Sequence, residues 1–75
     1  MEFYEIVRGL REDREPKITQ SDVAEVLGAT QRKVSHIERG DAEPNLEDLR
    51  RLCKFYNVSA DYLLGLPKGL PYPER

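Results

Sequence analysis

The sequence predicts an all-α protein, a compact bundle of five short helices. Apolar residues recur at the helical i, i+3, i+4 spacing in several short segments, and residues that cap helices stand at the boundaries of these segments. No segment alternates apolar and polar residues as a half-buried strand does, and no internal repeat is visible. These patterns predict that the hydrophobic core is formed by helices packed against one another.

Length and composition predict a single domain. A chain of 75 residues has room for one small core, which we assign to residues 1–66, and a proline-rich tail follows at residues 67–75. The single cysteine excludes an internal disulfide and no Cys or His pattern has zinc spacing, so we expect no cofactor and no metal. Without an apolar run of about 18 residues or a signal peptide, we expect a cytoplasmic protein that does not enter a membrane.

The first helix is predicted over residues 3–14. Phe3, Ile6, Val7 and Leu10 form one apolar face at helical spacing. The helix should end before Pro16, because proline disfavours helical geometry in the residue that precedes it.

Two further helices are predicted within residues 18–40, at Gln20–Leu27 and Gln31–Arg39. Thr19 and Thr30 are suitable N-caps, and Asp22 stands where a capping box has its acidic residue. Only a few residues separate these helices, which is too few for an antiparallel pair. The spacing is typical of a helix-turn-helix, whose second helix is able to enter a DNA major groove.

The last two helices are predicted after a polar loop. Asn45 is a cap for a helix whose apolar positions are Leu46, Leu49, Leu52, Cys53 and Tyr56. A short fifth helix follows a cap at Ser59 and has an apolar face of Ala60, Leu63 and Leu64. The tail contains three prolines and cannot be helical.

The helix at residues 31–39 has one narrow apolar edge, Val34 and Ile37, and a polar, basic opposite face. Long hydrogen-bonding side chains are suited to reading base edges, and here these are Gln31, Arg32, Lys33 and His36. Residues expected to contact DNA phosphates, including those at helix N-termini, are Gln20, Thr30, Ser35, Arg39 and Asn45. The alternative is a solvated helix face, with Thr30 and Asn45 serving as ordinary caps.

The segment ITQSDVAEVLGATQRKVSHIERG resembles the helix-turn-helix of the phage-repressor type, the Cro and lambda-repressor family, also called the xenobiotic-response-element family. The segment PNLEDLRRLCKFYNVSADYLLG is similar to the fourth and fifth helices of that family, so the likeness covers residues 6–66. It implies a lambda-repressor-like fold, an ion pair between Arg11 and Glu38, and a homodimer on a two-fold symmetric operator. Two departures affect the phosphate contacts: the loop REDREPKI is longer than usual, and DAEPN is acidic.

These observations predict sequence-specific binding of double-stranded DNA by a small transcriptional regulator, a repressor, with no evident small-molecule effector. The net charge of -2 requires that binding come from a local face rather than from overall charge. The alternative is an antitoxin or adaptor that uses the same fold to hold a protein. An enzyme is not expected, because the chain has one histidine, one cysteine on an apolar helix face and no phosphate-binding glycine loop.

The homodimer that the resemblance implies requires a surface at which two copies meet. The apolar candidates for it are Tyr62, Leu66 and the tail residues Leu70, Pro71 and Tyr72.

Overall fold

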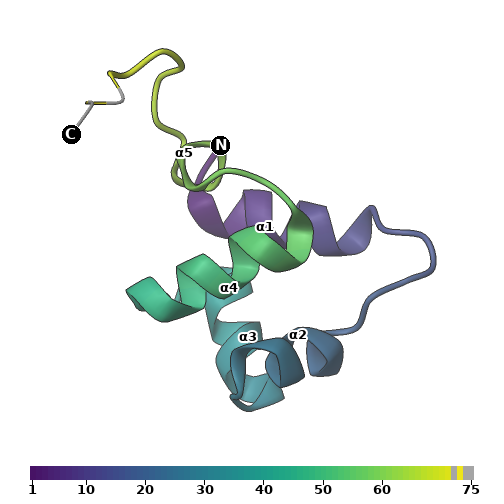
Figure 1. The fold of residues 1–75 in the computed structure, drawn as a ribbon. Coiled ribbons are helices and arrows are strands. Elements are labelled where there is room, and N and C mark those ends of the chain that lie inside the picture. Colours follow the sequence, from purple (N-terminus) through teal and green to yellow (C-terminus); the bar gives the residue numbers. More distant parts are fainter. Residues whose placement is uncertain (72, 74–75) are drawn as a thin grey trace.

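Five α-helices form the protein in a computed structural model that describes residues 1–71 and Pro73 (Figure 1). In chain order they are α1 (Phe3–Glu12), α2 (Gln20–Leu27), α3 (Gln31–Arg39), α4 (Leu46–Tyr56) and α5 (Ala60–Leu64). The described part of the chain contains no strand. The predicted all-α fold is therefore confirmed. Tyr72, one of the tail residues considered for a dimer surface, lies outside the described residues.

Caps fix the ends of the helices where the sequence predicted them. At four helix starts a side-chain oxygen accepts a hydrogen bond from the backbone N–H three residues later; the capping residues are Thr19, Thr30, Asn45 and Ser59. Four helices end at a residue in the left-handed conformation, namely Gly28, Gly40, Asn57 and Gly65. The boundaries of α2 and α3 consequently agree with the prediction.

Gly40 is needed for two reasons. Its φ of 81° is in the region that favours glycine. A Cβ atom at this position would also lie 2.9 Å from Cδ1 of Tyr4. A glycine after α3 therefore lets the start of α1 pack against the end of the helix-turn-helix.

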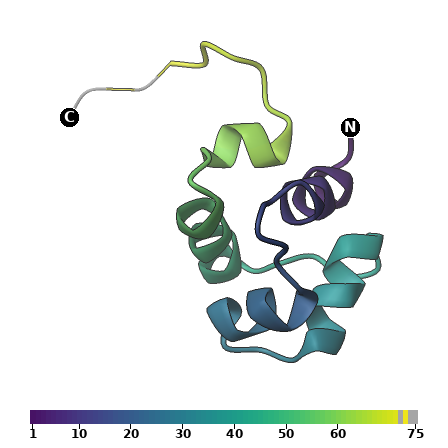
Figure 2. The same cartoon turned by 90° about the vertical axis from the view of Figure 1, so that its right-hand side faces the viewer.

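The core is formed by side chains from all five helices: Val7, Val23, Ala24, Leu27, Val34, Ile37, Leu52, Tyr56 and Leu63. α3 packs against α1 and α2, whereas α4 packs against α2 and α5. In both views α2 and α3 lie together at one end of the molecule, and the N-terminus and the described part of the tail lie at the other (Figures 1 and 2). The outer face of α3 thus lies at the end of the molecule opposite the described part of the tail.

Two details differ from the prediction. α1 ends at Glu12, two residues early, because Arg14 turns back and donates a 2.6 Å hydrogen bond to the carbonyl oxygen of Tyr56 at the end of α4. Leu46, which the sequence placed on the apolar face of α4, is 80% exposed because it stands at the first position of the helix, beyond the reach of the core.

No helix in the described residues is long and apolar enough to cross a membrane.

Candidate nucleic-acid interface

An open polar hollow lies on the outer face of α3 and is completed by the first residue of α2. The side chains that line it are Gln20, Gln31, Arg32, Ser35, His36 and Arg39. Val34 and Ile37, on the opposite edge of α3, are buried in the core. The structure thus gathers six of the nine residues that the sequence singled out for DNA contact on one surface.

A buried ion pair supports this surface from below. The Nε atom of Arg11 lies 2.8 Å from Oε2 and 3.1 Å from Oε1 of Glu38, whose residue surface is 1% exposed. Arg11 Nη1 also donates to the carbonyl oxygen of Ile18, at 3.2 Å, in the loop before α2. The hydrogen bond to Glu38 raises the pKa of Arg11, so the guanidinium stays charged. The pair that the resemblance implied is therefore present, and it joins α1 to α3.

Gln20 belongs to the same network. Its Nε2 atom donates a 3.1 Å hydrogen bond to Oε1 of Glu38. An amide nitrogen has two N–H groups, so one of them stays available to an acceptor outside the protein. Glu38 therefore orients the side chain that is predicted to contact a phosphate.

Gln31 is oriented by a residue that the sequence did not single out. Ser21 Oγ donates a 3.2 Å hydrogen bond to Oε1 of Gln31, across the turn between α2 and α3. With its oxygen engaged, Gln31 keeps the two N–H groups of Nε2 available as donors in the hollow that it lines. Such a side chain is suited to acceptor atoms on a base edge.

Lys33 is turned away from the hollow. Its Nζ atom lies 2.8 Å from Oδ2 of Asp48 in the first turn of α4, and it does not line the hollow. Asp48 is 4% exposed. The sequence placed Lys33 with Gln31, Arg32 and His36 as base-reading side chains. In this structure Lys33 does not share the hollow with those three.

Two of the predicted phosphate contacts act as caps. Thr30 Oγ1 accepts from the backbone N–H of Lys33 at 3.2 Å, and Asn45 Oδ1 accepts from that of Asp48 at 2.7 Å. Capping uses their acceptor oxygens and leaves the Thr30 hydroxyl proton and the Asn45 amide N–H groups as donors.

Arg39 lies in the hollow, where its Nε is 3.3 Å from Oδ2 of Asp41 in the acidic loop.

Sequence reasoning missed Ser21 and Asp48. Both act through partners on another helix, at separations of 10 residues for Ser21 and Gln31 and 15 for Lys33 and Asp48. No local pattern indicates such pairs. In the structure Asp48 stands at the third position of α4, where its carboxylate completes the capping box with Asn45.

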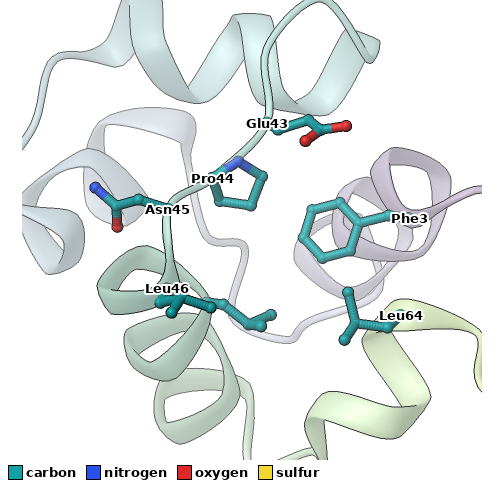
Figure 3. A pocket seen from close by; sticks show the side chains of 7 residues that line it. Phe3, Glu43, Pro44, Asn45, Leu46 and Leu64 are labelled. Carbon is teal, nitrogen blue, oxygen red and sulfur yellow. The ribbon is translucent and has the colours of Figure 1, made fainter.

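A second surface hollow is apolar. It lies between the start of α1, the loop before α4, α4 itself and the end of α5, and Figure 3 shows Phe3, Pro44, Leu46 and Leu64 around it. Its full lining is Phe3, Glu43, Pro44, Asn45, Leu46, Leu49 and Leu64. Leu46 and Leu64 are 80% and 48% exposed, so the hollow presents apolar surface to solvent.

Comparison with known proteins agrees with this geometry. The chain is 38% identical over 65 residues to the HTH-type transcriptional activator BcrR of Enterococcus faecalis, a match that covers 87% of this chain and 31% of BcrR. It is 43% identical over 47 residues to the HTH-type transcriptional regulator ImmR of Bacillus subtilis (strain 168), covering 63% of this chain and 37% of ImmR. The chain therefore spans about a third of the length of these relatives.

Solved structures show the same fold. The P22 c2 repressor protein, in a crystal structure with the synthetic operator 9T in the presence of Tl+, superposes with a TM-score of 0.76 at 34% identity, over 85% of this chain and 94% of that one. A solution structure of the SOS-response transcriptional repressor LexA from Eubacterium rectale gives 0.77 at 19% identity, over 97% and 76% of the two chains, and supports the fold alone. The helix-turn-helix family matches residues 7–63. The chain belongs to this family, in its phage-repressor branch.

Proposed function

We propose that this chain binds double-stranded DNA in a sequence-specific manner as a small transcriptional regulator, with α3 in the major groove of a two-fold symmetric operator. The observation that carries the proposal is the polar hollow, in which exposed side chains of α3 and Gln20 of α2 converge on one face. The P22 c2 repressor, which is 34% identical, is bound to an operator in its crystal structure, and this supports action as a repressor.

The side chains divide into two roles in this proposal. Gln31, Arg32 and His36 read base edges, with Arg32 offering two donors to a guanine. Phosphates are contacted by Gln20, Thr30, Ser35, Arg39 and Asn45, through side-chain donors and helix N-termini. Arg39 would exchange its contact with the exposed Asp41 for a phosphate, at little cost, because both partners are already in water.

Selection of bound duplexes from a random DNA pool tests the proposal. We expect a palindromic consensus whose half-sites lie about one helical turn apart. Arg32→Ala should weaken binding by about 1–3 kcal/mol and relax the preference at one base pair, as measured by titration of single-base variants of the selected duplex. The matched control is Arg50→Ala, which removes an exposed arginine from α4, outside the hollow.

The control should leave base preference unchanged. Retention of full selectivity by Arg32→Ala would refute the base-reading role of Arg32. A wild-type chain that binds no duplex at about 50 mM salt, where phosphate contacts are strongest, would refute DNA binding itself.

We also propose that the chain binds its operator as a homodimer. A slightly acidic protein gains affinity when two copies of its basic face engage one duplex. The apolar hollow of Figure 3, together with Tyr62 and Leu66, supplies exposed apolar surface for a second copy.

The same apolar hollow supports a second candidate function, in which the chain is an antitoxin or adaptor that holds another protein. The two functions differ in their response to salt. DNA affinity should fall steeply with salt, at a log–log slope of about 0.9 for each phosphate neutralised, whereas an apolar protein contact should be nearly insensitive.

A further inference from the structure

We propose that Asp48 is a positioning residue that holds Lys33 on the protein, so that Lys33 contacts neither bases nor phosphates when α3 docks. This inference rests on the proposed DNA binding and concerns the division of labour on the same surface. It removes Lys33 from the set of base-reading side chains expected from the sequence.

The carboxylate of Asp48 is fixed from two sides. Its Oδ2 atom accepts a 3.2 Å hydrogen bond from the backbone N–H of Asn45, which completes the capping box of α4, and lies 2.8 Å from Nζ of Lys33. The Asp48 side chain is 5% exposed and that of Lys33 is 38% exposed. The charge of Lys33 is thus directed at a buried partner, while part of its side chain remains exposed.

Transfer of Lys33 to a phosphate would be unfavourable. It would leave the buried carboxylate without its counter-charge, and the loss of one partner from a buried pair is strongly destabilising. The gain would be a screened contact at the protein surface. Lys33 should therefore stay with Asp48 in the complex.

The pair also connects α3 and α4 directly, in addition to the packing of both helices against α2. α3 packs against α1 and α2, and α4 against α2 and α5. Gln31 and Arg32 stand at the N-terminus of α3, and Asn45 caps α4. The ion pair therefore adds a direct connection between the proposed base-reading end of α3 and a proposed phosphate contact at α4.

The variant Asp48→Asn tests the proposal. An amide oxygen preserves the acceptor for Asn45 N–H but removes the charge that holds Lys33, which then becomes free to reach a phosphate. We expect tighter binding to the duplex selected by the wild type and to a shuffled duplex of the same composition. The log–log salt slope should steepen by about one, so the ratio of affinities at 50 mM and 200 mM salt should rise a further three- to fourfold or so.

The matched control is Asp22→Asn. Asp22 occupies the equivalent capping-box position of α2, where its Oδ2 accepts from Thr19 N–H at 2.9 Å, but it is exposed and has no lysine partner. This control changes the net charge equally and should keep the wild-type salt slope. In the double variant Asp48→Asn/Lys33→Met the slope should return to the wild-type value.

Two results would overturn the proposal. One is a salt slope of the Asp48→Asn variant that equals the slope of the wild type, when thermal unfolding shows that the variant is folded. The other is a relaxed preference at one base pair when Lys33 is replaced in the Lys33→Met variant. This variant leaves Asp48 unchanged, so it tests the proposal even if Asp48→Asn fails to fold. Both require that the wild type bind the selected duplex, so they are distinct from a failure of DNA binding itself.

Discussion

Tyr56 shows how a single residue couples the core to pH. The residue is 1% exposed and its hydroxyl oxygen has no hydrogen-bond partner among the described residues. The ring lies under the guanidinium of Arg14, whose Cζ is 5.4 Å from the ring centroid. Burial, and then the negative charge of Glu38, raise the pKa of Tyr56 to about 12.

We expect Tyr56→Phe to be neutral or slightly stabilising at pH 7, because it removes a buried hydroxyl that forms no hydrogen bond. Its effect should differ at high pH. An unfolded tyrosine titrates near pH 10, so the raised folded-state pKa stabilises the protein fully below about pH 10 and this contribution is lost as the pH rises towards 12.

Urea unfolding of both proteins between pH 9 and about 12 measures this effect. The free energy of unfolding of the wild type should fall more steeply than that of Tyr56→Phe, by up to about 1.4 kcal/mol per pH unit. All other ionisable groups are the same in both proteins, so they cancel in the comparison. Parallel curves would show that Tyr56 ionises equally in the folded and unfolded states.

At the scale of the helices, arginines make long-range connections that caps cannot provide. Arg51 Nη1 donates to the carbonyl oxygen of Leu27 at the end of α2, at 3.1 Å, as Arg14 does for α4. A cation near a helix C-terminus satisfies unpaired carbonyls and opposes the helix dipole. Arg11 differs, because its partner is the buried carboxylate of Glu38 in α3.

The Arg11 pair should contribute far more stability than a surface pair. Arg11→Met leaves Glu38 buried and without its counter-charge, which should cost about 3–5 kcal/mol in urea unfolding at pH 7. The control Arg50→Met breaks a pair with Glu47 whose side chains are 64% and 49% exposed, and it should cost less than about 1 kcal/mol. Similar losses for the two variants would contradict the structural role of the buried pair.

The double variant Arg11→Met/Glu38→Leu separates the attraction between Arg11 and Glu38 from the cost of leaving a buried carboxylate unpaired. An apolar replacement of both partners removes the buried charge, so the double variant should be more stable than Arg11→Met alone. Its DNA affinity should nevertheless fall for all sequences, because Gln20 loses the acceptor that orients it.

At the scale of the whole molecule, the apolar hollow is the surface on which a second copy packs in the proposed dimer. Leu46 is 80% exposed in it and does not contribute to the core. Leu46→Glu should therefore leave the stability of the monomer within about 0.5 kcal/mol of the wild type. It should prevent a second copy from packing, because a carboxylate would be buried in the interface.

Sedimentation equilibrium measures the expected change from dimer to monomer, and a titration with the selected palindrome should show that two half-sites no longer bind together. Lys54→Glu is the control, since Lys54 is exposed in the last turn of α4 and does not line the hollow. A wild type that remains monomeric on the palindrome, or a Leu46→Glu variant that dimerises normally, would contradict this use of the hollow.

The sequence by itself determined the helices, their caps and the face of α3 that carries polar side chains. These features depend on residues within about four positions of one another, such as Thr19 with Asp22, so their signals are local in the chain. The resemblance added Arg11 and Glu38, a pair separated by 27 residues that no local pattern connects. It thereby indicated how α1 meets α3.

Only the tertiary structure decided which polar side chains of α3 line the polar hollow. Arg32 and Lys33 are adjacent and both positively charged, yet Lys33 pairs with Asp48 and Arg32 lies in the polar hollow. The partner of Lys33 stands 15 residues away on a different helix, and Gln31 is likewise oriented by Ser21 of α2. Such pairs form only when the packing of the helices brings their ends together, and helical periodicity carries no information about that packing.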